Sequence, residues 1–176
     1  MRISHLRRNV ELKARDPDPA RSRTVCEELG AESRGVLSQR DTYFQAPNGR
    51  LKLREDGGPA AELIAYTRAD LPGERESAYR IVEVSQPEEL RHALAETLGI
   101  EIVVEKQRHL FLWENVRIHL DEVDGLGSFI ELEAVAGSES DLSREQRQVQ
   151  TLRDAFGVAE SDLVALSYSD MSRPSS

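Results

Sequence analysis

The sequence of 176 residues contains one cysteine, three lysines and no long hydrophobic run. Cys26 alone excludes an internal disulfide and any metal site built from several cysteines. No apolar run exceeds four residues, which excludes a transmembrane helix, because such a helix needs about 20 apolar residues. The N-terminal residues also lack the apolar segment of a secretory signal. We therefore expect a cytoplasmic protein with no membrane partner.

Basic residues are fewer than acidic ones: the sequence has 23 Lys and Arg against 32 Asp and Glu, which gives a net charge of −9. Nucleic acids attract a net basic surface, so we do not expect one as a partner. The length favours one domain, which we assign to residues 1–171, with residues 172–176 as a disordered tail. The oligomeric state stays open, with a homodimer as one option because exposed strand edges and helices are commonly paired.

Most of the chain alternates polar and apolar residues, as strands do when their two faces have different surroundings. Asn9, Glu11 and Lys13, for example, alternate with Val10, Leu12 and Ala14. Clusters of Gly, Pro, Asn and Asp at 46–49, 56–59 and 124–127 mark turns between such segments. The expected strands span residues 9–14, 35–44, 50–54, 62–68, 78–84, 102–112, 116–121 and 130–133.

Three helices are expected, at residues 18–29, 85–98 and 143–156, each followed by glycine. Ser85 with Glu88, and Ser143 with Gln146, have the spacing of capping boxes at the starts of the second and third helices. The order strand, helix, strands therefore occurs twice. We interpret it as two similar half-motifs within one domain, because neither half has enough apolar residues to fold alone.

Several strands carry two like charges two residues apart, on one face and about 7 Å from each other. A solvated sheet face with mixed polar residues is the simpler explanation for any single strand. Like charges this close repel, however, and all three lysines of the chain fall on these faces. We therefore predict an α+β fold in which the sheet curls into a barrel or tunnel with the charges inside. The pairs are Lys52 with Arg54, Lys106 with Arg108, and Glu131 with Glu133.

Such an interior would suit an anion with several charges, most naturally a polyphosphate. Glu131, Glu133 and Glu11 would hold a hard divalent cation, Mg²⁺ or Mn²⁺, that bridges phosphate oxygens. Zn²⁺ would need His or Cys ligands, which we do not expect to cluster. His119 shares a strand face with Arg117 and Asp121, where a structural hydrogen bond and proton transfer are both open roles.

The segment Asn9-Val10-Glu11-Leu12-Lys13 resembles the Glu-x-Glu-x-Lys signature of the CYTH superfamily, also called the triphosphate tunnel metalloenzymes. The superfamily includes class IV adenylyl cyclases, thiamine triphosphatases and inorganic triphosphatases. The likeness continues in order to the end of the chain and is closest to the class IV adenylyl cyclase branch. It implies an eight-stranded antiparallel β-tunnel with helices packed outside. The further matching segments are 41–44, 51–54, 106–108, 119–123, 126–133 and 167–170.

The resemblance also assigns roles to residues of this chain. Glu11, Glu131 and Glu133 match the metal-binding carboxylates, and Asp121 matches an acidic tunnel position that we place, with Lys13 and Arg108, in catalysis. Asn9 replaces the first Glu of the signature, which predicts weaker metal binding or a changed metal preference. The expected triphosphate-binding residues are Lys13, Lys52, Arg54, Arg68, Lys106 and Arg108, to which strand parity adds Arg80 and Arg117.

We therefore predict an enzyme that uses Mg²⁺ or Mn²⁺ to act on a nucleoside, thiamine or inorganic triphosphate. Hydrolysis is favoured because no base-specific motif is visible. No lysine follows Lys106, so the C-terminal lysine of thiamine triphosphatases has no counterpart, which counts against that activity. The alternatives are a class IV-type adenylyl cyclase that makes cyclic AMP and pyrophosphate from ATP, a non-catalytic polyphosphate- or nucleotide-binding module, and a structural domain with a solvated charged sheet.

Overall fold

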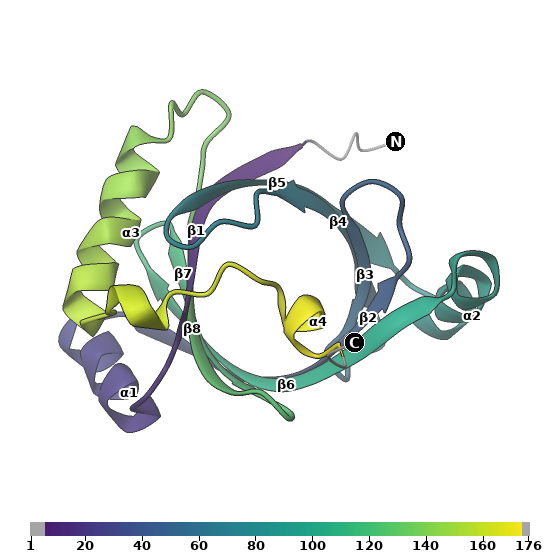
Figure 1. Ribbon diagram of the computed structural model, residues 1–176, viewed down its shortest axis with the longest axis horizontal. Coiled ribbons are helices and arrows are strands. Elements are labelled where there is room, and N and C mark those ends of the chain that lie inside the picture. The colour runs from purple at the N-terminus through teal and green to yellow at the C-terminus, as the bar shows by residue number, and fades with distance from the viewer. Residues whose placement is uncertain (1–5, 174–176) are drawn as a thin grey trace.

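The computed structural model describes residues 6–173, in which antiparallel strands close into a barrel with helices outside it (Figure 1). The barrel order is β1-β5-β4-β3-β2-β6-β7-β8, and β8 pairs back onto β1. The predicted eight-stranded fold is confirmed. The strands are β1 (Arg7–Arg15), β2 (Glu32–Phe44), β3 (Arg50–Glu55), β4 (Ala61–Arg68), β5 (Arg75–Val84), β6 (Ile100–Trp113), β7 (Val116–Val123) and β8 (Gly127–Val135).

The two predicted half-motifs are visible in the order of elements. The first half runs β1, α1 (Pro19–Glu28), β2, β3, β4, and the second runs β5, α2 (Pro87–Leu98), β6, β7, β8. The counterparts are β1 and β5, β2 and β6, β3 and β7, and β4 and β8. When each strand is exchanged with its counterpart, the order around the barrel is the same, read in the opposite direction. The halves meet at four strand pairs: β1 with β5, β4 with β5, β2 with β6 and β1 with β8. Because the sheet closes within the described residues, it offers no strand edge for a dimer contact.

Both predicted capping boxes are wrong. Pro87 occupies the first turn of α2, so Gln86 rather than Ser85 is the N-cap, and it makes no side-chain capping bond. α3 (Ser143–Phe156) starts one residue earlier than a Ser143 cap would require, and the Ser143 N–H instead donates to Asp141 Oδ1 at 3.0 Å. In contrast, α1 has a side-chain cap: Asp18, the first residue of the predicted helix 18–29, is the N-cap and accepts from the Arg21 N–H.

The hydrophobic core lies outside the barrel, between its outer face and the helices. Leu12, Ile118 and Leu132 are fully buried there and pack with Val149 and Leu152 of α3. Burial of one such side chain contributes about 1.5–3 kcal/mol. The apolar half of each alternating strand therefore holds the helices, and the polar half is left to face the barrel interior.

The C-terminal segment crosses one end of the barrel, where α4 (Tyr168–Met171) lies over the opening (Figure 1). A short 3-10 helix (Glu160–Asp162) precedes it, and the Val164 N–H donates to the Lys13 carbonyl at 2.9 Å. Of the expected disordered tail, Ser172 and Arg173 are described, and Arg173 forms an ion pair with Glu101; residues 174–176 lie outside the described part. None of the helices between residues 6 and 173 combines the length and apolar character needed to cross a membrane.

Candidate functional site

The barrel encloses a cavity of about 1020 Å³ that is lined by residues from all eight strands. Lys52, Arg54, Lys106 and Arg108 line it, as do Glu131 and Glu133. The prediction that these charges face inward is confirmed. A structural domain whose charged sheet face is open to solvent is excluded.

One side of the cavity carries Lys52, Arg54, Lys106 and Arg108 from β3 and β6, which we call the cationic wall. Three of these side chains converge on Asp41 of β2, which is 1% exposed. Arg54 donates to Asp41 through Nε and Nη2, each at 2.8 Å, and the Lys52 Nζ lies 2.8 Å and the Lys106 Nζ 3.2 Å from Asp41 Oδ2. One carboxylate thus holds three cations at the cavity surface.

Burial gives these groups unusual proton affinities. It lowers the pKa of Lys52 to about 8, helped by the nearby Arg54. It lowers the pKa of Lys106 to about 7, helped by Arg108. Burial alone would raise the pKa of Asp41, but Arg54, Lys106 and Lys52 hold it well below its usual range. An anion in the cavity would stabilise the charged form of both lysines.

Arg108 links the cationic wall to the acids. Its Nε lies 2.7 Å from Asp121 Oδ1, and its Nη2 lies 2.5 Å from Asp121 Oδ2 and 2.7 Å from Glu131 Oε2. The Tyr168 hydroxyl of α4 donates to Asp121 at 2.9 Å, and the Lys13 Nζ lies 3.6 Å from the centre of the Tyr168 ring. α4 therefore fixes two of the residues that we predicted to be catalytic.

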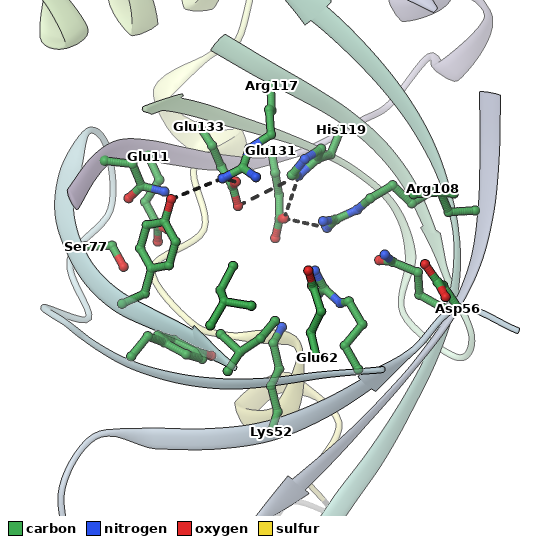
Figure 2. A pocket seen from close by; sticks show the side chains of 18 of the residues that line it. Glu11, Lys52, Asp56, Glu62, Ser77, Arg108, Arg117, His119, Glu131 and Glu133 are labelled. Atoms are coloured by element: carbon green, nitrogen blue, oxygen red, sulfur yellow. Dashed lines mark hydrogen bonds and ion pairs between the residues drawn. The ribbon is translucent and has the colours of Figure 1, made fainter. Parts of the chain in front are cut away.

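The next two strands around the barrel carry His119 of β7 with Glu131 and Glu133 of β8, which we call the acidic wall. Figure 2 shows the three side chains pointing into the cavity, with Lys52 across from them. One ligand atom from each lies within 4.8 Å of the other two. The Lys13 Nζ is 3.0 Å from Glu131 Oε1, and the Arg117 Nη2 is 3.2 Å from Glu133 Oε2.

Charged neighbours keep the two glutamates of this trio ionised. Burial would raise the pKa of both glutamates, but Lys13 and Arg108 hold that of Glu131 well below its ordinary value, and His119 and Arg117 lower that of Glu133. The pKa of His119 is lowered by burial and by Arg108. The wall therefore presents two carboxylates and a neutral imidazole near neutral pH.

Glu11 lies apart from this trio. It is the cross-strand partner of Glu133, but its Oε1 accepts from Arg68 at 2.5 Å and from Arg75 at 2.9 Å. Two guanidinium groups thus hold the carboxylate that the family resemblance assigns to the metal. One histidine joins the two glutamates, because the register of β7 and β8 pairs His119 directly with Glu131.

Of the remaining predicted residues, Arg68 and Arg117 line the cavity, but Arg80 does not. Ser77 and Tyr79 face inward, so the intervening alternation of β5 leaves Arg80 exposed on the outer face. The parity on which we placed it was shifted by one residue. Several residues that line or support the site had no predicted role: Asp41, Arg75, Tyr43, Tyr66, Tyr79 and Tyr168.

Apolar side chains line the cavity beside the charged ones. Leu110 is the cross-strand partner of His119, Leu37 that of Arg108, and Ile64 that of Lys52. Leu37, Ile64 and Ile81 line the cavity together with Leu110. Asp56, Glu62 and Glu83 also line the cavity, and the first two are labelled in Figure 2; Glu62 is the cross-strand partner of Arg54 and of Glu83.

Comparison with known proteins gives one family and several relatives. The CYTH domain model matches residues 7–168. A Methanocaldococcus jannaschii protein named "Putative adenylate cyclase MJ0240" is 23% identical over 179 residues, covering 92% of this chain and 97% of its own. The structure of the PH1012 protein from Pyrococcus horikoshii OT3 has a TM-score of 0.79 at 22% identity, over 92% of this chain and 98% of that one. A structure titled as a "putative adenylate cyclase" from Vibrio parahaemolyticus has a TM-score of 0.75 at 20% identity, over 93% and 96%.

Proposed function

Because the chain belongs to the CYTH family, we propose that it binds a small-molecule triphosphate in the barrel and hydrolyses it with a divalent metal ion. The observation that carries this proposal is one cavity in which the cationic wall adjoins the acidic wall: Lys52, Arg54, Lys106 and Arg108 line it together with Glu131 and Glu133, and Arg108 contacts Glu131 at 2.7 Å. Phosphoryl transfer depends on positioning and on charge neutralisation, and it uses both cationic side chains and metal ions for this purpose.

The residues fit a metal ion of the proposed kind. Glu131 and Glu133 are ionised, lie close together and face the cavity, and one or two carboxylates are what Mg²⁺ and Mn²⁺ use beside substrate phosphates. Asn9 also lines the cavity, is 3% exposed, and has an Oδ1 without a hydrogen-bond partner in the described chain. When bound, the metal would act as a Lewis acid toward phosphate oxygens.

Different side chains of the protein would bind the phosphates, stabilise developing charge and orient these groups. Lys52, Arg54 and Lys106 bind the phosphate oxygens, since Asp41 already holds them in place at the cavity surface. Arg108 contacts both Asp121 and Glu131, so it stands where it can stabilise charge that develops in the transition state. Asp121 and Tyr168 orient this guanidinium group. Lys13 neutralises Glu131 from the other side.

The apolar part of the cavity favours a triphosphate that carries an organic group. A volume of about 1020 Å³ is at the upper end of ordinary small-molecule sites, which range over about 300–1,000 Å³. Leu37, Ile64, Ile81 and Leu110 offer nothing to a phosphate but would pack against an organic ring. Asp56, Glu62 and Glu83 nearby would repel the extra phosphates of a longer polyphosphate.

Product analysis tests the proposal directly. The protein is incubated with ATP, thiamine triphosphate or inorganic triphosphate, with Mg²⁺ or Mn²⁺ and with a chelator as control. We expect metal-dependent release of inorganic phosphate, with a higher kcat/KM for an organic triphosphate than for the inorganic one. Binding of all three without turnover would reject the enzyme and leave a polyphosphate- or nucleotide-binding module.

Cyclisation of ATP is the second candidate, because the relatives from Methanocaldococcus jannaschii and Vibrio parahaemolyticus bear the name adenylate cyclase. In that reaction the ribose 3′-hydroxyl attacks the α-phosphorus and pyrophosphate leaves. The same cationic and acidic walls would serve it. Formation of cyclic AMP and pyrophosphate from ATP in equal amounts would favour the cyclase over the hydrolase.

A further inference from the structure

His119 stands out in the acidic wall because its Nδ1 atom has no hydrogen-bond partner among the described residues. The residue is 4% exposed, and the Nδ1 lies 3.5 Å from Glu131 Oε2 and 3.9 Å from Glu133 Oε1. A polar atom that is buried without a partner costs about 1–3 kcal/mol. Such an atom, aimed at two carboxylates in a cavity, indicates a ligand that is shared among the three groups.

The alternative role for His119 is to donate a hydrogen bond that positions Glu131. The two distances are too long for a good hydrogen bond, whose usual length is about 2.7–3.2 Å. These distances suit three ligand atoms that surround a common metal ion, because one such atom from each of His119, Glu131 and Glu133 lies within 4.8 Å of the other two. Glu131 also already receives the Arg108 and Lys13 side chains, so it needs no further donor.

We propose that His119 is a metal ligand through Nδ1, and that the resulting set of one nitrogen and two carboxylates makes the site prefer Mn²⁺ over Mg²⁺. Mg²⁺ demands oxygen ligands and keeps its waters, whereas imidazole nitrogen suits transition metals. Asn9 acts in the same direction, because it supplies a neutral oxygen where the family signature has a carboxylate. The use of this ion in catalysis rests on the proposed function, but the ligand assignment rests on the geometry alone.

Pulsed electron paramagnetic resonance on the Mn²⁺-loaded full chain tests the assignment, because it detects a nitrogen bound directly to the ion. We expect a nitrogen coupling in the native protein and its loss in His119→Gln. The matched control is His109→Gln, since His109 faces the outside of the same barrel and contacts Ser33 at 3.0 Å. Circular dichroism shows whether each variant is folded.

Native protein labelled with the heavier nitrogen isotope only in histidine provides a test that needs no variant. The coupling should change to that of the heavier isotope if the bound nitrogen belongs to histidine. Calorimetry adds the affinities: we expect His119→Gln to weaken Mn²⁺ binding about tenfold or more and Mg²⁺ binding much less.

Absence of a histidine nitrogen coupling in the native protein, or its persistence in folded His119→Gln, would overturn the assignment. Equal or tighter binding of Mg²⁺ in the native protein would overturn the metal preference. Failure of the proposed function alone would look different: the nitrogen coupling would be present, but no triphosphate would be turned over.

Discussion

The cationic and acidic walls of the barrel differ in how the side chains that hold them together are partnered. On the cationic wall, Asp41 is already in contact with Lys52, Arg54 and Lys106, so the cations are held in position without a ligand. On the acidic wall, the His119 Nδ1 has no hydrogen-bond partner in the described chain, and Glu131 and Glu133 converge on it at longer distances. The proposed triphosphate would therefore meet cations that are already held in place, whereas the proposed metal ion would meet a histidine nitrogen without a partner in the described chain.

The largest expected effect comes from Glu131→Gln on the acidic wall. The substitution keeps the size of the side chain but removes the charge that faces Lys13, Arg108 and His119. We expect turnover of the preferred triphosphate to fall by about 10²–10³-fold, as measured by release of phosphate or pyrophosphate. Glu105→Gln is the control, because Glu105 is exposed on β6. Unchanged turnover in folded Glu131→Gln would remove Glu131 from the mechanism.

On the cationic wall the comparable change, Asp41→Asn, should act on stability first. It leaves Lys52, Arg54 and Lys106 buried without their common counter-charge, which lowers the free energy of unfolding by about 3–5 kcal/mol. Urea denaturation measures the loss, with Asp124→Asn in an exposed turn as the control. Inorganic triphosphate should restore more stability to this variant than it adds to the native protein. A variant as stable as the native protein would show that Asp41 does not organise the wall.

Binding of a triphosphate should depend on pH through the two buried lysines. Their pKa values of about 7 for Lys106 and about 8 for Lys52 leave both partly neutral at pH 8 before binding. An anion raises these values, so binding takes up protons and weakens as the pH rises through 7 and 8. Calorimetry at pH 8 in buffers of different ionisation enthalpy measures the uptake. Lys106→Arg, which stays charged, should reduce it; identical uptake in that variant would exclude Lys106 as a source.

A smaller effect is expected from Asn9→Glu. The substitution restores the carboxylate of the family signature in the cavity and adds a negative charge near the acidic wall. We expect divalent metal binding to tighten by about tenfold or less, since affinity follows the number of charged ligands, and Mg²⁺ should gain more than Mn²⁺. Metal titration by calorimetry measures both. Weaker binding of both ions would place Asn9 outside the metal site.

The smallest effect belongs to Arg80→Ala. The side chain is exposed on the outer face of β5, so its removal should leave the geometry of both walls unchanged. Turnover should stay within about twofold and the unfolding free energy within about 0.5 kcal/mol of the native values. A large loss of turnover would restore the inward placement that strand parity predicted.

The fold was accessible from the sequence because alternation fixes which face of a strand is apolar. Strands such as β1, with Glu11 and Lys13 against Leu12 and Ala14, place their charges in the barrel as soon as the apolar face packs on helices. β5 shows the limit. Its residues alternate less clearly, so a shift of one position moved Arg80 to the wrong face.

The composition of each cluster was less accessible, because it depends on register between strands that are far apart in sequence. Lys106 meets Asp41 across 65 residues, and Arg75 meets Glu11 across 64. The sequence also could not reveal that two arginines hold Glu11. The third member of the acidic trio is therefore His119 and not Glu11. A short cross-strand argument pairing His119 with Glu131 was the one signal that could have suggested it.

In the proposed function, both walls bind one ligand, a triphosphate with its metal ion. Calorimetry with inorganic triphosphate, in the presence and absence of saturating Mn²⁺, tests it most directly. We expect one triphosphate per chain, bound more tightly with Mn²⁺ than without it, with affinity lost in Arg54→Gln and kept in Arg80→Ala. Absence of binding, or the same affinity in native protein and folded Arg54→Gln, would contradict it.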